Sequence, residues 1–507
     1  MSRIELASLP ERFDAIVIGG GITGAGILRE AVRTGARVLL VEKNDYASGT
    51  SSASSKLVHG GLRYLKNGQW RLTLESVRER QRLLTQAPGL VEPQPFLMPI
   101  YRGRKPSKTT MRLGLWLYDR MAGVSASRWL TKAMLQKIQP HLRVAGLQGA
   151  MSYQDARTDD ARLVLRLVME AIAEGGTALN YVAASILSGN ERITGVRLDD
   201  AVSGQSREVH ADVVINAAGA WAGNISNVAG APRLRPLRGS HMVFTAQRFP
   251  LTHAVSWLHP RDDRPIFAYP WEGAVIYGTT DLDHDTSLDE PAMTSGESAY
   301  LMEGLDYQFP EMKFTREDVI ATYSGVRPVV DGGKDDPSAE SRESAMWSSP
   351  GLVNITGGKL TTFRVTARQV LHEAARQAAK LRPVAEGPVF SMAGGEGDRR
   401  LNGRLGAQAA AALRRDAKPG ELETIRHTPY CWAELRWAAR REQVVHLEDL
   451  LMRRTRIGLV MAGGGRDILP RVNEICREEL GWDDARWAIE EARYLDRWQR
   501  LHAPVSA

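Results

Sequence analysis

A short apolar run that enters a glycine-rich turn does most to constrain the fold of this chain. Residues 13–18 are predicted to form a buried strand, residues 22–34 a helix, and residues 37–42 a second apolar strand. A strand, a crossover helix and a second strand in this order predict neighbouring parallel strands. The chain is therefore expected to contain an α/β domain built around a parallel sheet.

The turn between the first strand and the helix has the glycine spacing of a dinucleotide site. Gly19, Gly21 and Gly24 form GxGxxG, in which the first glycine permits the tight turn, the second lets backbone approach a pyrophosphate, and the third lets helix pack on strand. The N–H groups at the helix start then face the anion. Glu42 ends the second strand, where a carboxylate meets ribose hydroxyls and disfavours a 2′-phosphate. FAD or NAD is therefore expected rather than NADP.

Two further turns favour FAD over NAD. The α/β part of the sequence holds one such glycine fingerprint, which suits either a flavin that the substrate reduces directly or a simple NAD dehydrogenase. Strand-to-turn patterns recur at Gly219 and at 357–358. Because a long cofactor needs contacts from several strand ends, these distant turns indicate FAD. Three glycines at 463–465 lie between helical stretches and are interpreted as an ordinary turn.

A run of hydroxyl and small residues follows the expected ribose-binding acid. Residues 50–64 read TSSASSKLVHGGLRY, and two glycines within this segment would allow a flavin ring to approach closely. The alternative interpretation is a polar surface loop. The hydroxyls and one lysine are suited to bind a pyrophosphate. The candidate cofactor contacts lie in residues 50–56, the serine-rich turn, and are Thr50, Ser51, Ser52, Ser54, Ser55 and Lys56.

The composition suits a folded chain of several domains. The 507 residues predict about three structural units, and 43% hydrophobic and 25% charged residues are ordinary for a globular protein. Cys431 and Cys476 are far apart and form no CxxC motif, so no zinc, iron–sulfur or other metal site is expected.

Breaks in composition and the positions of prolines and glycines divide the chain into six segments. The expected segments are 1–88, 150–235 and 323–392 for the FAD-binding domain, 89–149 and 236–322 for an inserted substrate domain with an antiparallel sheet, and 393–507 for a helical C-terminal domain.

The net charge is +7, and this modest basic excess alone does not choose between an anionic substrate, a membrane surface and nucleic acid. No helix-turn-helix, zinc-finger or RRM signature is present, so a nucleic-acid partner is not expected. The N-terminal segment does not read as a signal peptide, and no apolar run reaches the roughly 20 residues that a membrane span needs.

Several blocks of the sequence resemble the FAD-dependent glycerol-3-phosphate dehydrogenases, within the group of flavoproteins similar to D-amino-acid oxidase. The most specific blocks are TSSASSKLVHGGLRYL at 50–65 and GGKLTTFR at 357–364. The others are IVIGGGITGAG at 16–26, DDARLVL at 159–165, NAAGAWA at 216–222, GSHMVF at 239–244, YGTTD at 277–281, TYSGVRP at 322–328 and the segment 430–458. The resemblance implies an FAD-binding Rossmann-like domain of the glutathione-reductase and D-amino-acid-oxidase type.

The resemblance also implies where ligands bind. The expected substrate contacts are Arg63, Tyr64, His241, Arg327, Arg342 and Lys359, because cations that converge on one pocket suit a phosphate. The expected catalytic residues are His241, His59, Arg327 and Lys359. Beyond the glycines, Glu42 and the serine-rich turn, the expected FAD contacts are Ile22, Thr23, Val182, Gly219, Trp221, Gly358, Lys359, Leu360 and Thr361.

The implied reaction is oxidation of sn-glycerol 3-phosphate to dihydroxyacetone phosphate by hydride transfer to FAD. A base must take the C2 hydroxyl proton, and His241 and His59 both remain candidates, since imidazole titrates near working pH. A flavin-dependent amine or amino-acid oxidase of the same fold is the main alternative, and a flavin-dependent RNA-modifying enzyme is a further one.

The reduced flavin needs an acceptor, and the resemblance implies membrane quinone or, in some members, oxygen. Basic residues at 102–112 precede Leu113, Leu115 and Trp116, a pattern typical of a helix lying at an anionic membrane surface, although a core-packing helix is equally consistent with it. The expected location is the cytoplasm, in peripheral contact with the inner face of the membrane. A homodimer is a candidate assembly.

Overall fold

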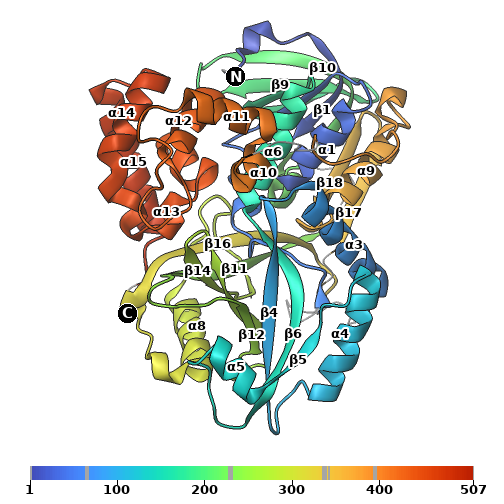
Figure 1. The fold of residues 1–507 in the computed structure, drawn as a ribbon. Helices are drawn as coiled ribbons and strands as arrows, with labels where there is room; N and C mark the ends of the chain where they lie inside the picture. The colour runs from blue at the N-terminus through green and yellow to red at the C-terminus, as the bar shows by residue number, and fades with distance from the viewer. Residues whose placement is uncertain are drawn as a thin grey trace.

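The structure of the protein is a computed structural model that describes residues 3–62, 68–225, 232–333, 340, 343–391 and 397–505. It contains two large sheets and a set of C-terminal helices (Figure 1). In Figure 1 the first sheet lies in the upper half with α1, α6 and α9, and the second lies in the lower half with α4, α5 and α8.

The first sheet has the expected parallel core. Its central strands run in the order β18-β10-β1-β2-β7, all parallel, and β17, β9 and β8 extend it in antiparallel fashion. The strands are β1 (Arg12–Ile18), β2 (Val38–Glu42), β7 (Thr177–Asn180), β8 (Val182–Ser188), β9 (Ile193–Asp200), β10 (Ser206–Asn216), β17 (Ser344–Ser349) and β18 (Leu352–Gly357).

Three helices pack on this sheet around one apolar core. They are α1 (Ile22–Val32), α6 (Asp160–Ala173) and α9 (Phe363–Ala374). The helix predicted over 22–34 is therefore confirmed to within two residues. Because the parallel strands are covered, β1 and β2 are almost continuously buried and apolar rather than alternating.

The second sheet is antiparallel apart from one pair. Its order is β15-β11-β14-β13-β12-β4-β6-β3, with β16 beside β11 and β5 beside β6, and β4 pairs with β12 in parallel. The strands are β3 (Leu57–Val58), β4 (Val91–Tyr101), β5 (Arg128–Thr131), β6 (Leu147–Thr158), β11 (Leu234–Thr245), β12 (Ala254–Leu258), β13 (Pro265–Trp271), β14 (Ala274–Gly278), β15 (Leu282–Asp283) and β16 (Val319–Val330).

Both faces of the second sheet are covered. In β14, Ala274 and Ile276 belong to the core shared with the C-terminal helices, whereas Val275 and Tyr277 belong to the core on the opposite face. This alternation is the period of two that a strand imposes. The helices around the sheet are α3 (Trp70–Gln86), α4 (Lys108–Ala122), α5 (Lys132–Ile138) and α8 (Ser295–Gln308). Helix α8 lies within the segment 236–322, for which the sequence predicts an antiparallel sheet and no helix.

The C-terminal region is helical, as predicted. Its helices are α10 (Arg399–Leu405), α11 (Ala407–Asp416), α12 (Trp432–Arg441), α13 (Ile457–Val460), α14 (Leu469–Leu480) and α15 (Asp484–Leu501), with a π-helical turn, Asp449–Arg454, before α13. The five boundaries between the six segments remain a prediction. Strands β6, β11 and β16 each run across one of them, at 150, 236 and 323 respectively.

Candidate functional site

The glycine turn between β1 and α1 has no room for side chains. A Cβ on Gly24 would lie 1.9 Å from the carbonyl oxygen of Gly19, so helix and turn are in backbone contact there. Gly19 has φ +112°, a conformation that L side chains rarely adopt, and its N–H donates to the carbonyl of Val41 at 2.8 Å. The turn thus presents bare backbone at the start of α1.

Glu42 lies against this turn. Its Oε2 accepts a hydrogen bond from the N–H of Gly20 at 2.7 Å, and its Oε1 accepts one from the N–H of Asn44 at 2.9 Å. Burial raises the pKa of the Glu42 carboxyl, and the two backbone hydrogen bonds offset part of that rise. Tyr181 donates its N–H to the carbonyl of Asn44 at 2.8 Å, which brings Val182 of β8 to the same strand end.

The serine-rich turn lies directly against the glycine turn. Ser51 Oγ accepts a hydrogen bond at 2.9 Å from the N–H of Ile22, the first residue of α1, next to Thr23. Thr50 Oγ1 donates to the carbonyl of Val326 at 2.5 Å, and this ties the turn to β16 of the second sheet. Ser52 Oγ donates to the carbonyl of Gly49 at 3.4 Å. The hydroxyls predicted for the cofactor therefore lie between the two sheets.

Two residues of this turn direct their polar atoms to the N-terminus of α6. Ser54 Oγ donates to Asp160 Oδ2 at 2.8 Å, and Lys56 Nζ lies 3.1 Å from both oxygens of the same carboxylate. Lys56 and Asp160 are fully buried. Burial, followed by the charge of Arg456, lowers the pKa of Lys56 to about 7, although Asp160 opposes the shift. In the structure Lys56 is thus the partner of a buried carboxylate.

His241 is buried in β11 beside the serine-rich turn. Its Nε2 lies 2.9 Å from Ser55 Oγ, and its ring stacks on Tyr323 of β16 with centroids 4.6 Å apart. Among the described residues, Nδ1 has no hydrogen-bond partner. Burial, together with the nearby charges of Arg327 and Lys56, lowers the pKa of His241 well below its usual value, so the ring is neutral.

Arg327 of β16 is held by a carboxylate. Its Nη1 donates to Asp281 Oδ1 at 2.8 Å, and Asp281 Oδ2 also pairs with Arg264 at 2.9 Å. A Cβ on Gly239 of β11 would lie 2.4 Å from Arg327 Nη2, so the missing side chain leaves space for the guanidinium. Arg327 and His241 therefore belong to one polar group on neighbouring strands.

Two more strand ends of the first sheet contribute turns. After β10, Gly219 adopts φ +59° and its carbonyl accepts a hydrogen bond from Thr356 Oγ1 at 2.9 Å. Trp221 lies close to the serine-rich turn, because a Cβ on Gly49 would be 2.9 Å from its ring. Trp221 Nε1 is buried, and no hydrogen-bond partner for it is found among the residues that the structure describes.

The turn after β18 reaches the segment of His59. Thr361 Oγ1 donates to the carbonyl of His59 at 3.3 Å, and Gly358 has φ +83°. Leu360 packs against the core of the first sheet. The charge of Lys359 lowers the pKa of Glu75 in α3, while burial raises it more, so Lys359 and Glu75 are electrostatic neighbours.

Three predicted substrate contacts lie outside the described residues: Arg63, Tyr64 and Arg342. Conversely, the prediction omitted Asp160, Asp281 and Tyr323, which position the candidate side chains. Each of these three lies inside one of the sequence blocks on which the resemblance rests, at 159–165, 277–281 and 322–328. Their position within these blocks was the one sequence feature that could have marked them as site residues. The side chains that they contact become visible only in the fold.

The residues at these turns fit a dinucleotide. A cavity of about 470 Å³ adjoins the serine-rich turn and is lined by Lys43, Asn44, Gly49, Thr50, Trp221 and residues of the C-terminal helices, among others. This volume is within the usual range for ligand sites. The bare glycine turn and the buried N–H of Trp221 offer backbone and side-chain donors. No group of three metal-ligating side chains occurs within the described ranges.

The comparison with family models decides the family. Residues 14–370 match the model described as FAD dependent oxidoreductase. The chain belongs to this family. FAD is therefore the cofactor of this oxidoreductase, in agreement with the prediction from the glycine turn and the distant turns at Gly219 and 357–358. Residues 396–487 match a second model, the C-terminal domain of alpha-glycerophosphate oxidase.

Relatives of the oxidoreductase include proteins named glycerol-3-phosphate dehydrogenase. The aerobic glycerol-3-phosphate dehydrogenase of Staphylococcus haemolyticus is 38% identical over 372 residues, which cover 71% of this chain and 66% of that one. The chain thus matches slightly under two thirds of the length of that relative. A solved structure, the glycerol-3-phosphate dehydrogenase of Bacillus halodurans complexed with FAD, has a TM-score of 0.77 and 27% identity, and covers 98% of this chain and 96% of its own.

The fold is also shared more widely. The glycine oxidase of Geobacillus kaustophilus has a TM-score of 0.53 and 21% identity, and covers 75% of this chain and 100% of its own. This likeness concerns the fold of the oxidoreductase alone. The fold class predicted from the sequence is confirmed by the family match and by these structures.

Proposed function

We propose that this oxidoreductase oxidises sn-glycerol 3-phosphate to dihydroxyacetone phosphate and passes the electrons to membrane quinone. The observation that carries the proposal is the 38% identity to a glycerol-3-phosphate dehydrogenase. It is supported by the full-length similarity to a second enzyme of that name. The polar group of Arg327 and the neutral His241 suits a phosphorylated alcohol, because the Arg327 guanidinium can bind phosphate oxygens through its planar fork.

Oxidation of the C2 alcohol to a ketone removes a hydride equivalent from carbon and a proton from oxygen. When bound, FAD supplies the acceptor for the hydride. The glycine turn, Glu42, Ser51 and Trp221 are the residues that would hold the cofactor. The hydroxyl proton then needs a base within hydrogen-bond reach.

His241 is the better of the two candidate bases on the geometry. In the neutral tautomer whose Nε2 donates to Ser55 Oγ, Nδ1 carries a lone pair and has no described partner, so it can accept the proton. Burial and, after it, the charge of Arg327 keep the ring neutral by lowering the pKa of His241. A bound phosphate would offset that charge and raise the basicity of His241 when substrate is present.

Arg327 is suited to bind the phosphate or the developing alkoxide. Asp281 fixes the plane of its guanidinium, and Arg264 in turn fixes Asp281. Arg63, Tyr64, Lys359 and Arg342 remain proposed substrate contacts. His59, whose carbonyl contacts Thr361, remains a proposed residue on the cofactor side.

Helix α4 supports the proposal that the protein contacts a membrane surface. Leu113 is 67% exposed and Trp116 is 55% exposed on this helix, and Arg120 lies near the Trp116 ring. Exposed apolar residues beside cations suit docking at an anionic membrane surface. Among the described residues, no helix combines the length and apolarity needed to cross a bilayer. Contact with the inner face of the cytoplasmic membrane and a homodimer remain proposals.

Anaerobic reduction of the purified holoenzyme tests the reaction. We expect sn-glycerol 3-phosphate to bleach the visible flavin band, and glycerol without the phosphate to leave the band unchanged at the same concentration. Bleaching by glycine or another amine, but not by the phosphate ester, would show instead an amine oxidase of this fold. Quinone analogues and oxygen can then be compared as reoxidants.

Two histidine variants serve as matched controls in the same assay. His241→Ala is expected to slow flavin reduction by about 10²–10⁴-fold, the usual contribution of general base catalysis. His59→Ala should slow it much less. Equal rates in the two variants would refute the choice of His241 as base without affecting the substrate.

A further inference from the structure

The backbone of the serine-rich turn is held by charges that come from distant parts of the chain. Asp160, the first residue of α6, accepts hydrogen bonds from Ser54 N at 3.0 Å and from Lys56 Nζ at 3.1 Å. Lys56 Nζ also donates to the carbonyl of Ser52 at 2.8 Å. Since these groups are buried, each hydrogen bond is costly to lose.

The C-terminal region adds a second donor to the same carbonyl. Arg456 precedes α13, and its Nη2 donates to the carbonyl oxygen of Ser52 at 2.5 Å. The same Nη2 lies 3.5 Å from Asp160 Oδ1, and Nη1 donates to the carbonyl of Met452 at 2.8 Å. Arg456 is 1% exposed. One guanidinium therefore joins the turn, α6 and the C-terminal helices.

This contact lies next to the atoms that meet the cofactor site. Ser52 O accepts from both Lys56 and Arg456, so the orientation of the peptide that follows Ser52 is fixed. The preceding residue, Ser51, places its Oγ at the N–H of Ile22, where α1 begins. The fixed peptide therefore lies one residue from the hydrogen bond that ties Ser51 to that helix start.

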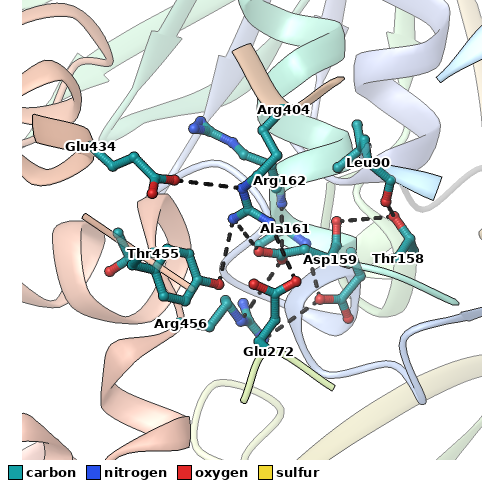
Figure 2. A network of polar contacts seen from close by, with 12 residues as sticks. Leu90, Thr158, Asp159, Ala161, Arg162, Glu272, Arg404, Glu434, Thr455 and Arg456 are labelled. Atoms are coloured by element: carbon teal, nitrogen blue, oxygen red, sulfur yellow. Dashed lines mark hydrogen bonds and ion pairs between the residues drawn. The ribbon is translucent and has the colours of Figure 1, made fainter. Parts of the chain in front are cut away.

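Other buried arginines join the C-terminal region to α6 without bonding to the turn. Arg404 of α10 donates from Nη2 to Asp159 Oδ2 at 2.8 Å and to Tyr430 Oη at 3.5 Å. Arg162 pairs with Glu442 through two hydrogen bonds of 3.1 Å and 2.8 Å. Figure 2 shows Asp159 between Arg404 and Arg456. Arg404 is 2% exposed, and is therefore about as buried as Arg456. Because it does not bond to the turn, it is a suitable control for Arg456.

We propose that Arg456 is a positioning residue through which the C-terminal helical domain holds the serine-rich turn in its FAD-binding conformation. Retention of FAD then depends on docking of that domain through the hydrogen bond from Arg456 to the Ser52 carbonyl. The inference rests on the proposed contact between this turn and FAD. It is independent of the substrate.

The test compares Arg456→Lys with Arg404→Lys in the full-length protein. FAD is removed and titrated back, and the dissociation constant is followed by flavin fluorescence. Both substitutions keep the charge and should lower the melting temperature of the apoprotein. Only Arg456→Lys is expected to raise the FAD dissociation constant, by about ten- to a hundredfold, as for loss of a hydrogen bond from a charged group. Arg404→Lys should leave it within about twofold.

The shift in melting temperature on adding FAD provides a second measurement. This shift measures how tightly FAD binds the folded protein and is separate from the stability of the apoprotein, because a ligand that binds more tightly stabilises the folded state more. Arg456→Lys should show a smaller shift than Arg404→Lys. If Arg456→Lys does not fold, Arg456→Gln, which keeps an amide donor, is tested in the same way. An FAD affinity unchanged in the Arg456 variant, or lowered equally in both, overturns the proposal.

Ser51→Ala separates this proposal from the one on which it rests. If Ser51→Ala weakens FAD binding and the Arg456 variants do not, the turn contacts FAD and the positioning role is refuted. If neither weakens it, both the placement of the turn at the cofactor and the role of Arg456 are refuted.

Discussion

The glycine turn at 19–24 and the serine-rich turn at 50–56 lie against each other, yet different parts of the chain hold them. The glycine turn is held by its own backbone, through the contact of Gly24 with Gly19 and the hydrogen bond from Gly19 to Val41. The serine-rich turn is held by Asp160 and Arg456, which are distant in sequence. Neighbouring segments of one site can therefore depend on local and on long-range interactions.

This difference explains which features the sequence could predict. The glycine spacing, the buried strands and α1 were predicted because each depends on residues close together in the chain. The contacts of Ser54 and Lys56 with Asp160 depend on how the two sheets meet, which no local pattern contains. A serine-rich segment looks the same in sequence whether its hydroxyls meet a cofactor or a buried acid.

The helix α8 and the parallel pair β4–β12 were not predicted, for a related reason. The region of α8 is flanked by short strands, and the helix has no strong apolar stripe by which to recognise it. Strand pairing across the chain, such as Ala254 with Phe96, is decided by the second sheet as a whole. The resemblance predicts that His241 and Arg327 serve one site, and the structure places them on the neighbouring strands β11 and β16, but the carboxylate Asp281 that binds Arg327 was not predicted.

The largest expected effect comes from removing the acid that holds the serine-rich turn. Asp160→Ala leaves Lys56 and Arg456 buried without their shared carboxylate. Breaking a buried ion pair in this way costs about 3–5 kcal/mol. Urea denaturation should show this loss in the free energy of unfolding. Asp496, whose side chain is 68% exposed in an ion pair with Arg500, is the control, and Asp496→Ala should cost about 0.5 kcal/mol. Similar losses in both variants would show that Asp160 contributes no more than an exposed ion pair, and that the serine-rich turn does not depend on it.

A smaller effect is expected at the glycine turn. A methyl group on Gly24 would overlap the carbonyl of Gly19, and backbone must shift to admit it. Gly24→Ala should cost about 1–3 kcal/mol and weaken FAD binding. Gly114 in α4 has open space around it, so Gly114→Ala should instead stabilise by up to about 1 kcal/mol. Thermal unfolding with and without FAD measures both, and a neutral Gly24→Ala would contradict the close contact.

The smallest effect is a pH dependence that belongs to the serine-rich turn alone. Burial lowers the pKa of Lys56 to about 7 in the folded protein, against about 10.4 in an unfolded chain. Between these values the unfolded state binds more protons, so the free energy of unfolding rises with pH, by at most ~1.4 kcal/mol per pH unit. Below pH 7 the lysine is protonated in both states and this contribution is flat.

Lys56→Met removes the titrating group and should abolish this rise. Urea denaturation of both proteins at pH 7 and pH 8 isolates the difference, since the other groups are common to them. A pH dependence identical in the two proteins would show that Lys56 does not lose its proton in this range.

The hydrogen bond between Arg456 and Ser52 also sets an order of events during synthesis. The two residues are 404 positions apart in the chain. At about 5–20 residues per second, the ribosome needs about 20–80 s to reach Arg456 after it has made Ser52. The segments that form β1, α1 and the glycine turn are synthesised long before Arg456, which completes the contacts of the serine-rich turn. A nascent chain should therefore acquire tightly bound flavin only near the end of translation.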